Sequence, residues 1–181
     1  MISFYKPNPR NTGSASSFSY KPKDGTFFVS FVKQYSWDAG RKIGSFTQNR
    51  NNPAASVNAK FGAHEIAGIL VAIERGEPDF STYHTSTNQT LQVNFGQYVK
   101  DGVVQSGYSL RITKDSNGQK TNFAMLLTLG EGRLLREYLV AALQEWSRKA
   151  FTYVPNQAPQ ESAPQQAEDQ EEPALVGNET W

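Results

Sequence analysis

Twice along the chain, the spacing of hydrophobic residues changes from the alternation typical of a strand to the spacing typical of a helix. This change constrains the fold more than any other feature of the sequence. Segments with alternating apolar residues precede one amphipathic stretch at 64–75 and another at 131–149. Each helix needs a sheet against which it can bury its apolar stripe. We therefore expect an α+β fold in which two antiparallel sheets are each followed by a helix. The second helix is predicted to bury Leu134, Leu135, Tyr138, Leu139, Ala142, Leu143 and Trp146.

The two halves of this pattern resemble each other. Phe61-Gly62 precedes the first helix, and Leu129-Gly130 precedes the second helix 68 positions later. This offset indicates a duplicated strands-then-helix unit. Asp101-Gly102 and Asn117-Gly118 are typical of hairpin turns. Strands are predicted at 26–34, 42–48, 54–61, 80–85, 90–98, 103–113 and 121–128.

The composition divides the chain into three parts. Residues 1–24 contain a small-polar stretch and are expected to form a flexible N-terminal arm. Residues 25–151 are expected to be the folded domain. From Thr152 onward there is no Lys or Arg, and residues 152–181 are expected to be a disordered acidic tail. Its acids are Glu161, Glu168, Asp169, Glu171, Glu172 and Glu179.

The residues before the tail are strongly basic. They hold 18 Lys and Arg residues against 11 acids, a net charge of +7, whereas the whole chain has a formal charge of +1. A basic body suits a polyanion, and an acidic tail can compete for the same surface or recruit another protein. The alternative is that the surface charge merely keeps the protein in solution.

The residues offer little for catalysis or metal binding. Cysteine is absent, which excludes disulfides and thiolate zinc sites, and the two histidines, His64 and His84, have no partner at metal-ligand spacing. The acids of the body are scattered and form no general acid–base pair. We expect a protein that is not an enzyme and has no cofactor. No signal peptide and no apolar run of about 18 residues is found, so a cytoplasmic protein without membrane contact is expected.

The segment from Lys33 to Arg50 combines aromatic and cationic side chains. Unpaired bases stack on aromatic rings, at about 1–3 kcal/mol per base, while cations follow the phosphates. Phe27, Phe31 and Phe46 could equally belong to the core. In the second half Arg111 is expected on the face of its strand away from the core. The expected nucleic-acid-binding residues are Lys33, Tyr35, Trp37, Arg41, Lys42, Phe46, Arg50, Lys60, Tyr98, Lys100, Arg111 and Lys114.

Residues 25–151 resemble the Whirly proteins. Tyr35-Ser-Trp37 followed by Arg41-Lys42, a strand, Gly62 and an apolar helix is similar to the first half of that domain, and the long helix with Trp146 is similar to its end. The resemblance implies a duplicated fold like that of PC4-type coactivators, binding of single-stranded DNA on antiparallel sheets, and assembly as a homo-oligomer. Related kinetoplastid proteins bind guide RNA. An evident Lys-Gly-Lys strand motif is missing, which leaves higher-order assembly open.

The tail resembles the acidic ends of bacterial and phage single-strand-binding proteins, which dock replication partners. Its sequence ends on Glu179-Thr-Trp181, and the expected partner-binding residues are Glu171, Glu172, Glu179 and Trp181. The alternative is a solubilising tail with an accidental final Trp. The tail suggests a phage or bacterial origin and, for a phage protein, a place in the host cytoplasm.

The leading hypothesis is a single-stranded DNA-binding protein, largely independent of sequence, that acts in phage or bacterial replication, recombination or repair. One alternative is a transcription cofactor that binds melted promoter DNA and recruits an RNA polymerase through its tail. RNA binding is another. From a different class, a structural or virion assembly protein would bind no oligonucleotide. The expected partners are single-stranded DNA or RNA, and replication or transcription proteins that bind the tail.

Overall fold

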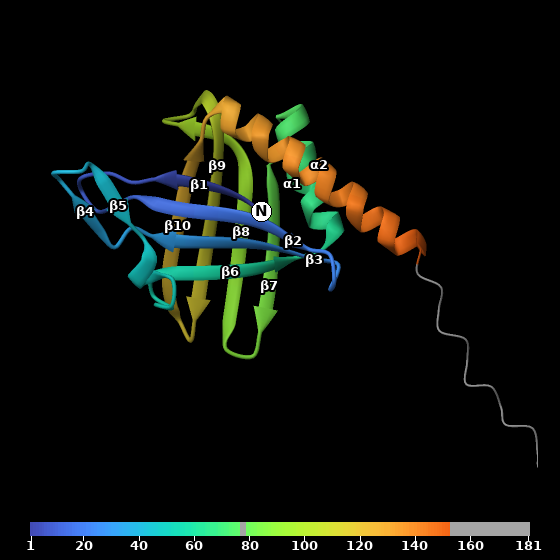
Figure 1. The fold of residues 1–181 in the computed structure, drawn as a ribbon, viewed down its shortest axis with the longest axis horizontal. Helices are drawn as coiled ribbons and strands as arrows, with labels where there is room; N and C mark the ends of the chain where they lie inside the picture. Colours follow the sequence, from blue (N-terminus) through green and yellow to red (C-terminus); the bar gives the residue numbers. More distant parts are fainter. Residues whose placement is uncertain (77–78, 153–181) are drawn as a thin grey trace, which may run out of the picture.

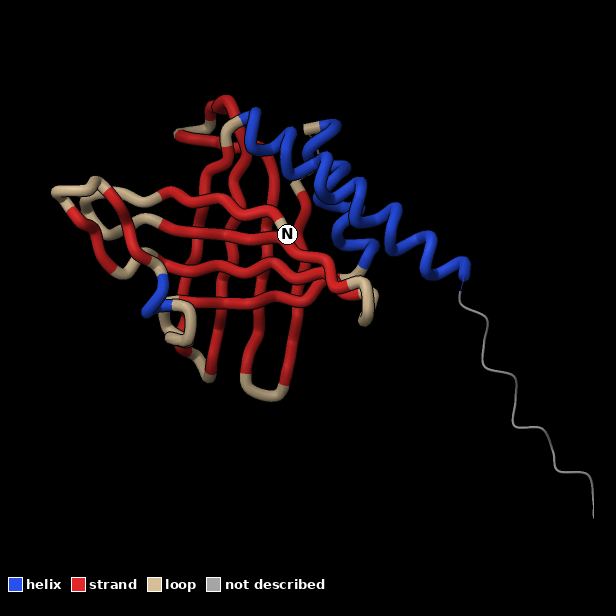
Figure 2. Tube along the Cα trace, in the orientation of Figure 1, coloured by secondary structure: helices blue, strands red, loops and turns tan. Residues whose placement is uncertain are grey.

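Two antiparallel four-stranded sheets cross each other face to face in the computed structural model, which describes residues 1–76 and 79–152. Helices α1 and α2 lie side by side along one edge of this pair of sheets (Figure 1, Figure 2). Each sheet is followed in the chain by one helix, so the predicted α+β class and the repeated strands-then-helix order are confirmed. In this described part, no helix is both long and apolar enough to cross a bilayer.

The first sheet has the strand order β1-β2-β3-β6, with every pair antiparallel. Strand β3 lies where a strand was predicted, and its two faces differ: Phe27, Val29 and Phe31 are buried, whereas Phe28 on the other face is only partly covered. The elements of this half are β1 (Ile2–Lys6), β2 (Ser14–Lys21), β3 (Thr26–Lys33), β6 (Ser56–Phe61) and helix α1 (Ala63–Arg75).

The prediction of a flexible arm at residues 1–24 is wrong, because this segment supplies strands β1 and β2. Phe18 of β2 is fully buried, and the small residues beside it let the second sheet approach closely. The hydroxyl of Ser14 donates to the carbonyl of Ala124 at 3.1 Å, and that of Ser16 donates to the sulfur of Met125 at 3.0 Å. The small polar residues of this segment are typical of a linker, but here they form a strand that packs closely against the second sheet.

The second sheet has the order β10-β9-β8-β7 and consists of three hairpins in sequence. Both predicted turns are confirmed: φ is 51° and 75° at Asp101 and Gly102, and 53° and 83° at Asn117 and Gly118. Positive φ at both central residues is the geometry that Asn-Gly and Asp-Gly favour. The elements of this half are β7 (Phe80–Ser86), β8 (Gln89–Lys100), β9 (Val103–Ser116), β10 (Gln119–Leu127) and helix α2 (Leu129–Thr152).

A small hairpin interrupts the first sheet between β3 and β6. It consists of β4 (Ser36–Asp38) and β5 (Ile43–Ser45), and a short 3₁₀ helix, η1 (Thr47–Asn49), follows it. The strand predicted over 42–48 is thus only three residues long. Figure 1 shows this hairpin at the end of the sheet that lies away from the helices.

One hydrophobic core joins both sheets and both helices. Phe31 of the first sheet contacts Phe123 of the second, with ring centroids 5.8 Å apart. Helix α2 adds Leu135, Leu139 and Ala142, as its period predicted. Leu134 was expected on the same face, but it is 59% exposed. Successive helical residues are about 100° apart, and the buried stripe is too narrow to include it.

The contrast between Leu134 and its neighbour gives a test of the packing of α2. Leu135→Ala should lower the free energy of unfolding by about 2–5 kcal/mol, because it leaves a cavity in the core. Leu134→Ala should change it by less than about 0.5 kcal/mol, since that side chain is exposed. Urea unfolding of both variants measures the difference. Equal losses would contradict the orientation of the helix.

Candidate nucleic-acid interface

The face of sheet β1-β2-β3-β6 that points away from the second sheet is called the outer face here. Strand registry arranges its side chains in three rows across the strands. The middle row consists of small polar residues, and the flanking rows each contain one aromatic ring. The rows are Tyr5, Ala15, Val32 and Ser56; then Ser3, Ser17, Ser30 and Asn58; then Ser19, Phe28 and Lys60.

A groove of about 570 Å³ lies over this face. The small middle row forms its floor, where the hydroxyl of Ser30 bonds to the side-chain oxygen of Asn58 at 2.9 Å. Tyr5 lines one side, and Arg50 and Lys114 line the groove where it passes β6. Serine side chains are short, so the rings and cations around them stand higher than the floor. The groove therefore offers hydroxyl groups below, with the ring of Tyr5 and the cations of Arg50 and Lys114 at its margins.

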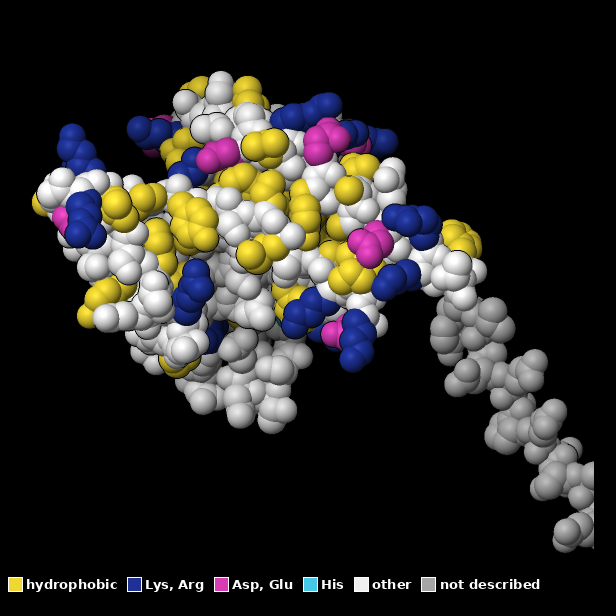
Figure 3. Space-filling model, in the orientation of Figure 1, with side chains coloured by type: hydrophobic (Ala, Val, Ile, Leu, Met, Phe, Trp, Pro, Cys, Tyr) yellow, Lys and Arg dark blue, Asp and Glu magenta, His cyan; other side chains and the backbone are white. Residues whose placement is uncertain are grey.

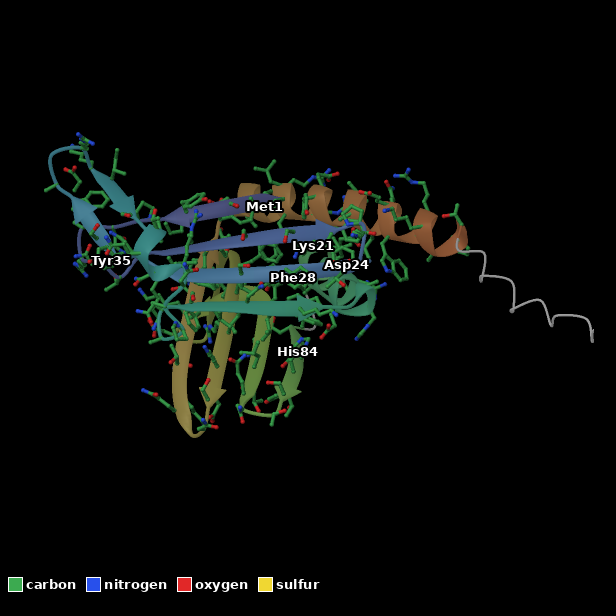
Figure 4. All side chains as sticks on the ribbon, turned by 60° about the horizontal axis from the view of Figure 1, so that its bottom comes forward. Met1, Lys21, Asp24, Phe28, Tyr35 and His84 are labelled. Carbon is green, nitrogen blue, oxygen red and sulfur yellow. The ribbon has the colours of Figure 1, made fainter. Side chains whose placement is uncertain are left out.

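The two rings of the outer face have different partners. Tyr5 is 56% exposed and packs edge-on against Phe46, with centroids 5.9 Å apart. Phe28 is half-buried, and the ammonium group of Lys21 lies 4.6 Å from its ring centroid. Figure 4 shows Lys21 and Phe28 together toward the α2 end of the sheet, with Tyr35 at the opposite end. A ring beside an ammonium group is the combination that a nucleotide requires.

Phe46 itself does not present a ring for stacking, contrary to the prediction. It is 7% exposed, because Tyr5 and the neighbouring loop cover it. Its role is to support Tyr5. Phe27 and Phe31, for which core and surface positions were both open, are core residues.

The charges of the sheets are almost all positive. The eight strands of the two sheets carry eight Lys and Arg residues and a single acid, Asp115. In β1, β2, β3 and β6 there is no acidic residue. Lys114 also donates to the carbonyl of Pro53 at 2.8 Å, which ties the end of β9 to the loop before β6. In the view of Figure 3 the acidic side chains lie at the margins of this face.

Several ion pairs of the described residues lie on the helix side instead. Arg136 of α2 contacts Glu74 of α1 at 2.6 Å, and Arg133 contacts Glu137 at 3.0 Å. Arg133 and Arg136 are neutralised by neighbouring carboxylates, whereas the ion pairs of the described residues include no cation of the outer face. The positive potential is therefore concentrated on the sheet side.

Lys6 also forms an ion pair on the helix side. Its ammonium group donates to Glu131 at 2.6 Å and ties β1 to the start of α2. Burial acts to raise the pKa of Glu131, but the hydrogen bonds from Lys6 and Thr128 outweigh it, and the pKa is lowered. The carboxylate also accepts from the backbone of Thr128 at 2.8 Å, while Thr128 accepts from the backbone of Glu131, so the helix begins with a capping box.

The hairpin β4–β5 carries four of the predicted residues. Tyr35 is 50% exposed, Trp37 is half-buried, and Lys42 turns the chain with φ of 55°. Arg41 is solvent-exposed and lies 3.8 Å from Asp38. The predicted loop with rings and cations thus exists, with Tyr35 at the end of the sheet opposite Phe28 (Figure 4).

Gln34 anchors this hairpin, a role that no sequence pattern indicated. Its side chain is buried and bonds to both the backbone N–H and the carbonyl of Asn8, at 2.8 and 3.0 Å, and to the carbonyl of Ser36 at 3.0 Å. Asn49 adds a bond to the Gln34 carbonyl at 3.2 Å. These bonds join the β1–β2 connection to the hairpin.

The other predicted residues are distributed over the molecule. Lys33 faces the inter-sheet side, with its ammonium group 5.0 Å from the ring centroid of Phe123. Arg111 is exposed on the outer side of the second sheet, as predicted. Tyr98 and Lys100 lie at the β8–β9 hairpin, near the start of α2 (Figure 1). The tail residues Glu171, Glu172, Glu179 and Trp181 lie outside the described residues.

The sequence reasoning missed Tyr5, Lys21 and Phe28. Phe28 was detectable, since alternation along β3 places it opposite Phe27. Tyr5 and Lys21 were hidden because their strands were interpreted as an arm.

His84 and Glu65 form the other notable polar cluster. Glu65 is buried, accepts from Thr82 at 2.6 Å and from the backbone of Gly62 at 2.8 Å, and lies 3.0 Å from the His84 ring nitrogen. The contacts hold the start of α1 on β7. Among residues 1–76 and 79–152 no three His, Cys, Asp or Glu side chains are placed to hold a metal ion.

The sequence matches no protein-family model and no curated protein sequence. Solved structures do match the fold. One is a guide-RNA-binding protein complex bound to its RNA, with a TM-score of 0.58, 14% identity and coverage of 82% of this chain and 92% of that one. The chain has a Whirly-like fold.

Two plant structures support this assignment. WHY3 from Arabidopsis thaliana matches with a TM-score of 0.55 and 12% identity, over 83% of this chain and 91% of that one. The plant transcriptional regulator PBF-2 matches with a TM-score of 0.54 and 12% identity, over 87% and 88%. The Whirly-like resemblance that the motifs suggested is thus confirmed for the fold.

The anchoring role of Gln34 can be tested in the Whirly-like body. Gln34→Ala leaves the partly buried backbone groups of Asn8 and Ser36 without partners and should cost about 1–3 kcal/mol of stability. Amide exchange at Asn8 should accelerate, because its N–H donates to Gln34. The exposed Gln48→Ala serves as the control and should do neither. Unchanged exchange at Asn8 in the Gln34 variant would refute the anchor.

Proposed function

We propose that this chain binds single-stranded nucleic acid along the groove of the outer face, with little dependence on sequence. The observation that carries the proposal is an acid-free sheet face with one ring on each side of a serine row, Tyr5 exposed and Phe28 half-buried. Tyr5 and Phe28 provide apolar surfaces for bases, while Lys21, Lys60 and Arg50 provide charge for phosphates.

The chemistry of this face favours single strands over duplexes. In a duplex the flat base faces are stacked inside the helix, so rings on a sheet cannot stack on them. In a single strand the bases turn outward and can lie on Tyr5 and Phe28. Serine hydroxyls donate and accept hydrogen bonds, which suits any base edge and selects no sequence.

DNA is the proposed ligand, and RNA is the second candidate. The likeness to a guide-RNA-binding complex favours RNA, whereas the likeness to a plant transcriptional regulator favours DNA. Competition between DNA and RNA oligomers of matched sequence separates them, since they differ at the 2′-hydroxyl.

We propose a role in replication, recombination or repair, with the acidic tail as a docking segment for a replication protein. If the tail retrieves an RNA polymerase instead, the protein is a transcription cofactor. The proposed protein is a cytoplasmic homo-oligomer without catalytic activity.

The two rings give a direct test. Phe28→Ala and Tyr5→Ala should each weaken binding of an oligo-dT by roughly 5- to 150-fold, the equivalent of one lost stacking contact. Tyr83→Ala is the matched control, because Tyr83 is 65% exposed on the outer side of the second sheet. Fluorescence anisotropy provides the affinities. Loss with Tyr83→Ala and none with the other two would move the site to the second sheet.

The cations give a second test. If Lys21, Lys60, Arg50 and Lys114 all contact phosphates, the logarithm of the binding constant should fall with that of salt concentration with a slope of about −3. Lys60→Gln should reduce the slope by about 0.7. Arg133→Gln should not change it, since Arg133 is paired with Glu137 on the helix side. A flat salt dependence for the wild-type protein would exclude the electrostatic part of the proposal.

A further inference from the structure

Strand β6 is an edge of the first sheet and has one unpaired side. Among the described strands it pairs only with β3. Just before β6, the backbone N–H of Lys33 donates to the carbonyl of Ala55 at 2.8 Å, and these two residues continue the registry of the β3–β6 pair. In an antiparallel pair, opposite residues alternate between those that exchange hydrogen bonds and those that do not. The bond from Lys33 therefore fixes the phase of this alternation along β6.

The phase determines which backbone groups of β6 face the open side. Val57, Ala59 and Phe61 exchange hydrogen bonds with β3, so the N–H and carbonyl groups of Asn58 and Lys60 point away from it. Both residues are exposed. In the described part of the chain, no turn, loop or side-chain hydrogen bond uses these backbone groups. The edge therefore presents donors and acceptors in alternation, as a strand does to its neighbour.

The second sheet extends past β6 and forms a ledge beyond this edge (Figure 1, Figure 4). The ledge consists of residues 84–91 and 114–121, which are the ends of the hairpins β7–β8 and β9–β10. Gln89 and Lys114 of the ledge line the groove together with Ser56 and Asn58 of β6, which places the ledge beside the edge. An extended chain that paired with β6 would lie on this polar surface.

The ledge also limits what can pair with β6. Two copies of the chain whose β6 strands paired antiparallel would be related by a two-fold axis normal to the sheet. This axis would place both second sheets on the same side, so that the two ledges would occupy the same space. A single extended segment has no second sheet and avoids this collision. The edge therefore fits a peptide segment rather than a second copy.

The side chains around the edge are mainly cationic. Lys60 points to the outer face at the edge itself, and Arg50 and Lys114 line the groove where it passes β6. Strand β6 has no acid, and the one acid of the ledge, Asp115, is on the opposite face of the second sheet from Lys114. Opposite charges on neighbouring strands stabilise their pairing. The edge therefore complements a segment with acidic residues.

The backbone groups of the edge favour a peptide over a nucleic acid. Phosphate oxygens accept hydrogen bonds and have no proton to donate, so a DNA backbone would leave the outward carbonyls of Asn58 and Lys60 without partners. A peptide backbone has one donor and one acceptor per residue and satisfies both kinds of group.

We propose that the free edge of β6 binds an extended acidic segment of a partner protein, which adds a strand to the first sheet. Main-chain hydrogen bonds to Asn58 and Lys60 provide the affinity, and acidic side chains of the segment contact Lys60 and Arg50. The inference goes beyond the proposed function and does not rest on it, because the hydrogen bonds form at the edge of the sheet and not on its outer face.

The probe for this contact is a blocked seven-residue peptide of alternating Thr and Glu, added to the full-length protein. The amide protons of Asn58 and Lys60 should exchange with solvent about 10-fold more slowly at saturating peptide, because they gain acceptors. The amide of Ala59 already donates to β3 and should not change. Amide exchange followed by NMR measures all three. Unchanged exchange at Asn58 and Lys60 would overturn the proposal.

A matched pair of variants tests the hydrogen bonds directly. Asn58→Pro removes an N–H that points away from β3, a position where an edge strand accepts proline, and should weaken peptide binding about 3- to 10-fold. Asn58→Ala loses the same side-chain bond with Ser30 but keeps the N–H, and should bind like wild type. Equal affinities of the two variants would contradict strand addition. If Asn58→Pro does not fold, the exchange rates of the wild-type protein decide.

Two other occupants give different results in the same exchange experiment. Protection of Asn58 and Lys60 by oligo-dT but not by the peptide would overturn the proposal and assign the edge to nucleic acid. Protection that grows with protein concentration, without peptide, would overturn it in favour of a second copy. If the protein binds the peptide but no oligo-dT, the proposed function fails and the strand addition stands.

Discussion

The burial of one face of each sheet against the other is the interaction on which the rest of the structure depends. Phe18 and Phe31 from the first sheet and Phe95 and Ile112 from the second are fully buried in one core. Each such side chain contributes about 1.5–3 kcal/mol when it leaves water. Since side chains alternate along a strand, satisfying the core on one face leaves the composition of the other face free. The outer face therefore carries rings, hydroxyl groups and lysines without cost to the core.

The sequence was sufficient for the parts of the fold that have a strong local period. Strand β3, both helices and the two turns at Asp101 and Asn117 follow from alternation, amphipathicity and turn chemistry. The N-terminal strands were not predictable in this way. Ser14 and Ser16 point into the core, where most strands have a large apolar residue. They fit because the second sheet approaches closely there, and that proximity is a property of the tertiary structure.

The dependence on tertiary structure also explains why the candidate site was only partly predicted. Arg50, Lys60 and Lys114 were identified by their charge, but the groove that Arg50 and Lys114 border depends on long-range pairing. Registry places Tyr5 on the same face as Phe28, which is 23 positions later in the chain. Aromatic content alone also could not separate an exposed ring from a supporting one. Phe46 lies in the predicted segment, yet it is buried beneath its neighbours.

The net charge of +1 is a poor guide to the surface that a ligand meets. Acids are accommodated on the helices, where Glu131 and Glu65 satisfy backbone donors at the helix starts and Glu74 pairs with Arg136. Strands offer no such role for a carboxylate, and those of the first sheet have none. At physiological salt, charges more than about 8 Å apart are largely screened from each other. A phosphate on the outer face therefore responds to the lysines and arginines around it, and the acids of the helix side do not cancel them.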